Sequence, residues 1–307
     1  MFFEHENIIK LINLYKIAKN RHISKKNIQQ FLKNKLKQNG EIKISYDVQS
    51  GDYIKYYNNF SKNQIDKVYY PIVKAIEENF YKTKTILDFG CGELTTSYYI
   101  FNNLKKKISK YFANDNSLNR LIIGKNYLKK RINKKNFNKF DIFCNANHKL
   151  PFKNNSIDLI ITIHSLEPNN RYKEKIFDEL FRVSRLGIIL MEPHYEISSE
   201  KQKKRMLKYD YVRGIEKMLK TKKIKYKVIK KNYHINKNNI SSLFIINKNN
   251  NKKKNDSTFV DPTSLTKLKF LKNYYYSKDS LRIFPIIEDI KIFNDDTQLF
   301  LPSLKIK

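Results

Sequence analysis

The sequence is poor in the residues and segments that mark secreted and membrane proteins. Its 307 residues include two cysteines, Cys91 and Cys144, so no disulfide framework holds the fold and a reducing, cytoplasmic location is expected. No apolar run approaches membrane-spanning length. The opening segment MFFEHENIIKLINLYKIAKN carries charges within its apolar pattern, which predicts an amphipathic helix and excludes a signal peptide.

Acidic residues are also scarce relative to basic ones. Asp and Glu total 29 against 62 Lys and Arg, a formal net charge of +33, which is typical of proteins that bind nucleic acid. Glycine and proline are few and tryptophan is absent, while Lys, Asn, Ile and Tyr abound, as an AT-rich coding sequence would produce. Because the lysines are spread along the whole chain, we favour this compositional explanation. A hydrophobic content of 40% and an aromatic content of 13% exclude a disordered polymer.

The hydrophobic pattern divides the chain into four regions. Residues 1–82 are helical in pattern and predict an N-terminal cap. Residues 83–247 alternate short apolar runs with amphipathic stretches, which is typical of βαβ units. Residues 248–257 form a polar linker, and residues 258–307 a compact tail rich in Tyr, Phe and Ile, for which a small α+β module is expected.

Strands and helices can be placed within the second region. Strands are expected at 85–89, 110–115, 141–145, 157–165 and 186–193, and helices at 95–107, 117–133, 172–184 and about 200–220. The runs 225–234 and 241–248 are close enough to pair as an antiparallel hairpin. This order predicts an α/β fold: a Rossmann-like, doubly wound sheet, mostly parallel, with a terminal antiparallel hairpin.

The stretch ILDFGCGELT, residues 86–95, indicates the ligand. Dinucleotide fingerprints need a third glycine so that the backbone can approach a pyrophosphate, and here Leu94 or Thr95 stands instead. S-adenosylmethionine has no phosphate, so two close glycines with nearby acids suffice. Asp115 ends the second strand, where a carboxylate can accept bonds from both ribose hydroxyls, and Asn145 ends the third, where an amide can read the adenine edge. These strand ends meet at the carboxyl edge of the sheet.

The series TILDFGCG, ANDNS, CNANHKLPFKNNSIDLIIT and DELFRVSRLGIILMEP resembles the class I S-adenosylmethionine-dependent methyltransferases over roughly residues 83–193. Motif positions that match are Leu150, Pro151, Phe152, Asp158, Glu179, Arg182, Val183 and Gly187. Leu94 in place of a frequent glycine, and Asn145 in place of the usual acid, are departures. The resemblance implies S-adenosyl-L-methionine as cofactor, bound by Asp88, Gly90, Cys91, Gly92, Asp115, Asn116, Asn145, Ala146 and His164.

The tail carries a second resemblance. FVDPTSLTKLKF followed by YYYSKDSLRIFPIIEDI looks like the small zinc-ribbon-derived module found beside, or fused to, some methyltransferases; Phe284, Pro285 and Ile286 match its Tyr-Pro-Ile motif. Asp261 and Ser277 fall where that module has cysteines, and no cysteine occurs beyond Cys144. Tetrahedral zinc requires thiolates or imidazoles. We therefore expect no bound metal and a module held by its aromatic core.

Candidate catalytic groups follow the fourth and fifth strands. Methyl transfer depends mainly on holding the acceptor in line with the sulfonium, and a base is needed only if the acceptor loses a proton. HSLEPNN places Glu167 at the crevice mouth, and EPHYE offers His194; these two are the predicted catalytic residues. The same residues could instead form the cofactor wall or satisfy internal hydrogen bonds. KRMLKYDYVRG could form a lid that places Arg205, Tyr211 and Arg213 over an anionic substrate, or be an ordinary solvated helix face.

The sequence is compatible with three functions, which differ in the methyl acceptor or in whether the protein is catalytic. A small or medium-sized biosynthetic acceptor, such as a sugar or glycan precursor, is favoured because no recognised RNA-binding module precedes the fold. An RNA methyltransferase is the alternative, favoured by the charge and by the resemblance of the tail to a module that assists RNA enzymes. A catalytically inactive, cofactor-binding interaction subunit is the third. Sequence does not decide the oligomeric state.

Overall fold

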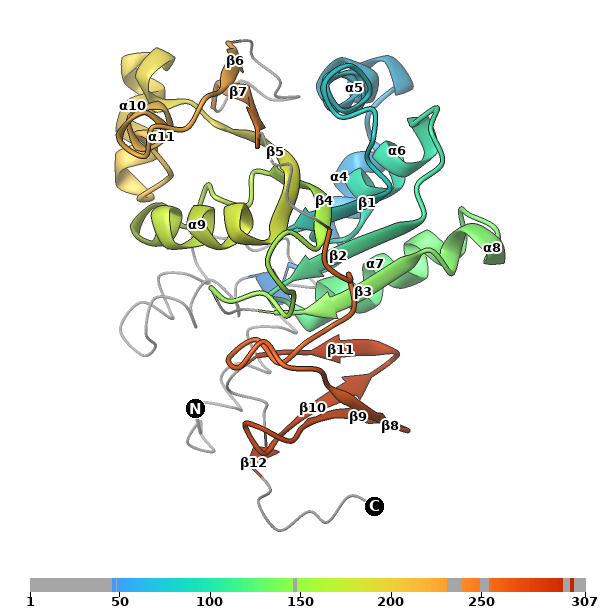
Figure 1. The fold of residues 1–307 in the computed structure, drawn as a ribbon. Coiled ribbons are helices and arrows are strands. Elements are labelled where there is room, and N and C mark those ends of the chain that lie inside the picture. The colour runs from blue at the N-terminus through green and yellow to red at the C-terminus, as the bar shows by residue number, and fades with distance from the viewer. Residues whose placement is uncertain are drawn as a thin grey trace, which may run out of the picture.

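The computed structural model describes residues 46–47, 49–145, 148–230, 239–248, 254–294 and 299–300. Its strands form one large mixed sheet in the order β6-β7-β5-β4-β1-β2-β3-β11-β10-β9-β8, with β12 paired to β10 (Figure 1). The N-terminal helical pattern of residues 1–45 and Ala146 lie outside the described residues. None of the helices described is long and apolar enough to cross a membrane.

The centre of the sheet is parallel, as the sequence predicts. It consists of β1 (Thr85–Phe89), β2 (Lys110–Asp115), β3 (Phe140–Cys144), β4 (Ile157–Ile163) and β5 (Ser184–Pro193), paired in parallel register. Strands buried on both faces read as near-continuous apolar runs, and IDLIITI of β4 is such a run. Because side chains alternate along a strand, Ile86 packs into one core and Leu87 into the other.

Helices cover both faces of the sheet (Figure 1). One core packs α5 (Lys62–Asn79), α6 (Thr95–Asn103) and α7 (Leu118–Lys129) against the sheet. The opposite core packs α9 (Lys173–Val183) and α11 (Ile215–Thr221). The remaining described helices are α4 (Asp52–Asn58), α8 (Lys134–Phe137), α10 (Glu200–Lys208) and the short 3-10 segments η1 (Asn170–Tyr172) and η2 (Tyr195–Ile197). This doubly wound arrangement confirms the predicted fold class.

One local expectation differs from the structure, and another is confirmed. The single helix expected over about 200–220 is broken into α10 and α11, because Asp210 and Gly214 both take positive φ, 48° and 71°, which a continuous helix excludes. The predicted hairpin is confirmed in its described part: β6 (Lys227–Ile229) pairs antiparallel with β7 (Ser241–Asn247), and β7 pairs antiparallel with β5.

The tail continues the central sheet. It contributes β8 (Lys269–Leu271), β9 (Tyr274–Ser277), β10 (Arg282–Ile287), β11 (Ile290–Ile292) and β12 (Leu299–Phe300). β11 runs parallel to β3, with Lys291 opposite Phe143. Its described residues contain strands and turns but no helix, unlike the expected α+β module. That residues 258–307 form a module of their own stays a prediction.

Candidate functional site

A cavity lies where the polar ends of β1, β2 and β3 meet, at the carboxyl edge of the sheet. Its volume is about 100 Å³, and it is lined by Tyr46, Phe89, Gly90, Asn114, Asp115, Asn116, Arg120, Asn145, His148, His164, Ser165, Pro168, Asn169 and Ile176. Ligands of open α/β sheets bind in the crevice outside these strand ends. Of the residues predicted to bind the cofactor, Gly90, Asp115, Asn116, Asn145 and His164 therefore line one cavity.

The glycine turn after β1 approaches its neighbours too closely for any side chain. Gly90 and Gly92 have φ of 74° and 57°, in the left-handed region. A Cβ on Gly90 would lie 2.3 Å from Cβ of Ser165, and one on Gly92 would lie 2.2 Å from a guanidinium nitrogen of Arg120. The backbone N–H groups of Gly90 and Cys91 both donate to the carbonyl of Asn114, which ties the turn to β2.

Asp115 stands beside this turn with its carboxylate already oriented. The N–H of Gly92 donates to Oδ2 at 2.9 Å, and the N–H of Ser117 donates to Oδ1 at 3.0 Å. Each carboxylate oxygen has a second lone pair available to a ligand hydroxyl. On the next strand, Asn145 is anchored to Asp115 through its backbone N–H and donates its side-chain N–H to the carbonyl of Lys149.

Asp88 and Cys91 have internal roles in the described structure. Asp88 is 1% exposed and does not line the cavity; it accepts hydrogen bonds from Ser97, at 2.6 Å, and from Tyr111. Burial raises its pKa to about 7. Burial likewise raises the pKa of the Cys91 thiol well above its ordinary value, so this thiol is a poor nucleophile at neutral pH. Both side chains therefore lie in the protein interior beside the glycine turn.

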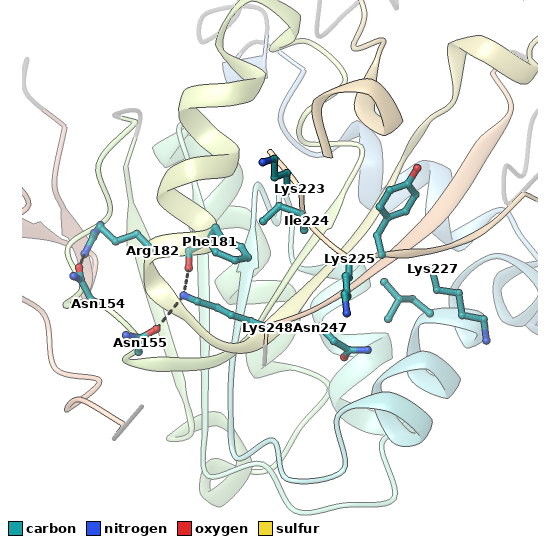
Figure 2. A pocket seen from close by; sticks show the side chains of 12 residues that line it. Asn154, Asn155, Phe181, Arg182, Lys223, Ile224, Lys225, Lys227, Asn247 and Lys248 are labelled. Carbon is teal, nitrogen blue, oxygen red and sulfur yellow. Dashed lines mark hydrogen bonds between the residues drawn. The ribbon is translucent and has the colours of Figure 1, made fainter. Parts of the chain in front are cut away.

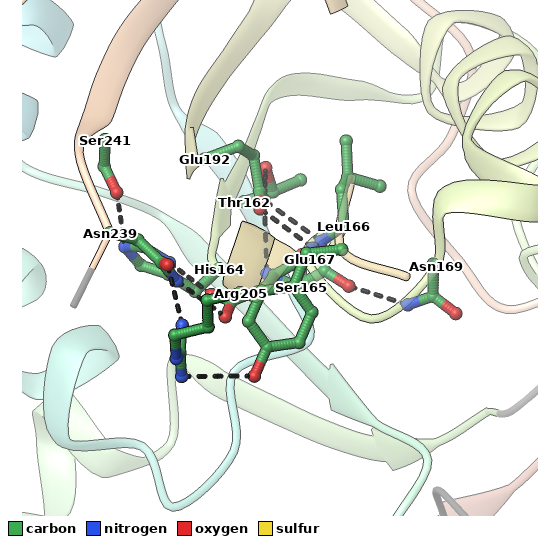
Figure 3. A network of polar contacts seen from close by, with 11 residues as sticks. Thr162, His164, Ser165, Leu166, Glu167, Asn169, Glu192, Arg205, Asn239 and Ser241 are labelled. Atoms are coloured by element: carbon green, nitrogen blue, oxygen red, sulfur yellow. Dashed lines mark hydrogen bonds and ion pairs between the residues drawn. The ribbon is translucent and has the colours of Figure 1, made fainter. Parts of the chain in front are cut away.

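The loop after β4 is organised by a polar network (Figure 3). Glu192, fully buried at the end of β5, accepts hydrogen bonds from the hydroxyl of Thr162 and from the N–H groups of Ser165, Leu166 and Glu167. A carboxylate buried without such donors would be costly. Glu192 therefore fixes the loop that carries Ser165, whose Cβ abuts Gly90.

Glu167 and His164 form a pair at the outer end of this network. His164 Nδ1 lies 2.8 Å from Glu167 Oε2, and His164 Nε2 lies 3.3 Å from the hydroxyl of Ser241 (Figure 3). Burial lowers the pKa of His164, but Glu167 outweighs it and the pKa is raised overall. Asn239 donates to the other oxygen of Glu167 and accepts from Arg205. The network thus holds Arg205 of the predicted lid in place.

His194 lies in a different environment from Glu167. It is 1% exposed, its Nδ1 is 2.8 Å from the hydroxyl of Ser242, and its Nε2 is 3.1 Å from Glu216. Neither His194 nor Glu167 lines the cavity, and the two make different contacts, so their catalytic roles stay predictions. Burial lowers the pKa of His194, against the opposing effect of nearby carboxylates.

Residues 46–47 and 49–54, here called the roof segment, pack beside the glycine turn and place Tyr46 in the lining of the cavity; sequence reasoning missed them. Glu93 of the glycine turn is 1% exposed and accepts hydrogen bonds from the N–H groups of Gly51 and Ile54. Ser117, after β2, donates its hydroxyl to Asp47. A buried acid directly after the two glycines was the available signal, because such a carboxylate needs partners.

Comparison with known proteins identifies a domain within the chain. Residues 87–191 match a family model described as a methyltransferase domain. Solved structures similar to this chain include the methyltransferase domain of bacterial CtHen1 (16% identity, 60% of this chain, 99% of that chain, TM-score 0.44). Another is a SAM-dependent methyltransferase from Aquifex aeolicus (18% identity, 64% of this chain, 97% of that chain, TM-score 0.43). A third is the YcgJ protein from Bacillus subtilis (14% identity, 59% of this chain, 95% of that chain, TM-score 0.42). No curated protein matches the chain. Residues 87–191 therefore carry a methyltransferase domain.

Proposed function

We propose that the cavity at the carboxyl edge holds the cofactor, with Asp115 on the ribose hydroxyls and Asn145 and Asn116 beside the adenine. The donor set fits: an oriented carboxylate and two amides converge on a glycine turn that leaves no room for a Cβ. Bound there, S-adenosylmethionine supplies a methyl group on a sulfonium. We propose that the site is completed by the backbone of Gly90, Cys91 and Gly92 and by the side chain of His164. Ala146, the residue after Asn145 in the sequence, is also proposed to contact the cofactor.

The proposed catalytic contribution of this chain is positioning rather than covalent chemistry. Ligand sites usually measure about 300–1,000 Å³, whereas this cavity measures about 100 Å³ and has Tyr46 in its lining. We therefore expect Tyr46 to move when the cofactor enters and then to exclude water. Where the acceptor loses a proton, the Glu167–His164 pair is the proposed acceptor of that proton; the contacts of His194 favour an internal role.

The proposed acceptor is a small or medium-sized biosynthetic molecule, such as a sugar or glycan precursor. The observation that carries this proposal is the small volume of the cavity, about 100 Å³. Tyr46, Pro168, Asn169 and Ile176 are among the residues that line it. A polymer would need an open path to the reacting centre, whereas a small acceptor can be enclosed with the cofactor.

One observation favours RNA as a second candidate acceptor. A groove of about 890 Å³ lies near the start of β4, opposite the carboxyl edge (Figure 2). It is lined by Lys223, Lys225 and Lys227, none of which has an acidic partner among the described residues, together with Asn154, Asn155, Phe181, Arg182, Ile224, Tyr226, Ile245, Asn247 and Lys248. Lysines that track a phosphate backbone give sequence-independent affinity.

Salt dependence separates the two acceptors. Binding of RNA through about six to ten phosphates would fall roughly 10³–10⁵-fold between about 50 and 200 mM salt. We expect instead that RNA binding is weak and does not saturate, and that the rate of methyl transfer to a small acceptor depends little on salt. Candidate acceptors for this assay come from mass spectrometry of a deletion strain. Replacing Lys223, Lys225 and Lys227 by glutamine should then leave methyl transfer unchanged. Tight, saturable binding of one RNA, with methyl incorporation and loss in this triple variant, would establish the RNA enzyme instead.

A further inference from the structure

Arg120 is a buried cation at the cavity, and one of its donor atoms has no hydrogen-bond partner among the described residues. The residue, on α7, is 8% exposed and lines the cavity. Its Nε is buried without a hydrogen-bond partner among the described residues. Its nearest carboxylate contacts are ion pairs of 3.7 Å to Asp115 and 3.9 Å to Glu93. Leaving a buried charged donor without an acceptor is costly.

Aromatic rings compensate part of this cost but leave the N–H groups available. The guanidinium carbon lies 4.9 Å from the ring centroid of Tyr46 and 4.5 Å from that of Tyr53. Both distances are within the range of cation–π attraction. The rings belong to the roof segment, so Arg120 joins that segment to Asp115.

We propose that Arg120 donates a hydrogen bond to a ribose hydroxyl of the cofactor whose proton is accepted by Asp115. Two atoms 3.7 Å apart, here Nη1 of Arg120 and Oδ2 of Asp115, leave room for one oxygen at hydrogen-bond distance from both. A hydroxyl donates one hydrogen bond and accepts others, so it satisfies the carboxylate and the guanidinium together. This assignment rests on the proposed function of the cavity and adds Arg120 to its binding residues.

Calorimetry with two ligands tests the role of Arg120. Arg120→Met should weaken binding of S-adenosylhomocysteine by about 10- to 100-fold, the range for a hydrogen bond to a charged group. Binding of the 2′,3′-dideoxy analogue should be weaker in the unsubstituted protein and unchanged by the substitution. Arg131→Met is the matched control, because Arg131 follows α7 and stacks on Tyr127 at 3.6 Å, and it should change neither affinity.

Three outcomes are informative. If Arg120→Met weakens both ligands by the same factor, or neither, Arg120 does not contact the ribose and the proposal is wrong. If Arg120→Met fails to fold, Arg120→Lys is measured in the same way; selective weakening of the hydroxylated ligand again supports the proposal, and equal weakening overturns it. If the unsubstituted protein binds neither ligand, the proposed function of the cavity has failed instead.

A separate observation concerns the tail, where two turns converge on one buried carboxylate. Asp261, fully buried, accepts hydrogen bonds from the N–H groups of Thr263 and Ser264, the hydroxyl of Ser280 and the guanidinium of Arg282. The hydroxyls of Ser277 and Ser280 and the charge of Arg282 outweigh burial and lower the pKa of Asp261. Arg282 also donates to Ser280 and Thr263.

The sequence spacing of these residues equals that of paired cysteines in structural zinc sites, but their side chains do not suit a metal. Asp261 and Ser264 are three residues apart, as are Ser277 and Ser280, and structural zinc sites pair cysteines in this way. Hydroxyls and one carboxylate are poor zinc ligands, and the described residues contain no metal-binding cluster of His, Cys, Asp and Glu. We infer that Arg282 joins these two turns in the role that a zinc ion has in a zinc ribbon.

Restoring cysteines tests this inference. A variant with Asp261→Cys, Ser264→Cys, Ser277→Cys and Ser280→Cys should bind one cobalt ion with the visible absorption of tetrahedral thiolate coordination. The unsubstituted protein, and a control with only Asp261→Cys and Ser264→Cys, should lack that spectrum. A quadruple variant that needs the metal to fold would also support the inference. One that stays folded without tetrahedral cobalt, or unfolded with the metal present, would show it to be wrong.

Discussion

Gly90→Ala is expected to abolish measurable cofactor binding and to lower the free energy of unfolding by roughly 2–5 kcal/mol. About 1–2 kcal/mol comes from placing a side chain at positive φ, and about 1–3 kcal/mol from overpacking. The added Cβ would lie 2.3 Å from Cβ of Ser165, so the loop held by Glu192 must shift away from the cavity. Chemical denaturation and calorimetry with S-adenosylhomocysteine measure the two effects.

Gly214→Ala is the matched control for backbone strain. Gly214 has φ of 71°, close to the 74° of Gly90, but no atom lies within 4 Å of its added Cβ. Gly214→Ala should lower the free energy of unfolding only by the contribution of backbone strain, and it should leave cofactor binding intact. Adding Ser165→Gly to Gly90→Ala removes the contacting Cβ and should restore part of the stability. Equal costs for the two alanine variants, without rescue, would mean that the close approach is unimportant.

Phe259→Ala is expected to lower the free energy of unfolding by about 3–5 kcal/mol, the range for truncating a buried aromatic residue. The ring of Phe259 lies 5.3 Å from those of Phe143 and Phe152 in the central domain and 5.3 Å from that of Phe293 in the tail. It therefore joins the tail to the core beneath β3. Urea denaturation of the intact chain measures the loss.

Phe270→Ala tests whether the effect of Phe259 reflects burial. Phe270 belongs to the same tail but is 58% exposed, so its truncation should cost less than about 1 kcal/mol. Because β11 pairs with β3, the tail and the central sheet should unfold in one transition. A separate early transition of the tail, with Phe259→Ala as mild as Phe270→Ala, would contradict this and support an independently folding module.

The sequence predicted most of the central fold because its signals are local. Apolar runs such as IDLIITI bury on both faces, and they can be read without tertiary information. The junction of β11 with β3 was not predictable in this way, since it pairs residues about 150 positions apart through strands that are only a few residues long. The break between α10 and α11 was missed because Asp210 takes positive φ without being glycine.

The site was predictable where it depends on strand ends and not where it depends on side-chain packing. Asp115 and Asn145 end neighbouring parallel strands, so their meeting at one edge follows from the topology. The internal contacts of His194 do not follow from the topology, because they depend on how the hydroxyl of Ser242 and the carboxylate of Glu216 surround the imidazole. The role of Arg120 could not be predicted either, because the sequence does not distinguish this residue from the many other basic residues, and only the structure shows that it is buried.

The central claim is that S-adenosylmethionine binds at the end of β2, and titration of S-adenosylhomocysteine into Asp115→Ala tests it most directly. Losing a charged hydrogen-bond partner should weaken binding by about 1–3 kcal/mol relative to the unsubstituted protein. Asp141→Ala is the control: Asp141 lies in β3, pairs with Lys110 and Lys291 and does not line the cavity, so its removal should leave affinity unchanged. Unchanged affinity in folded Asp115→Ala would contradict the account.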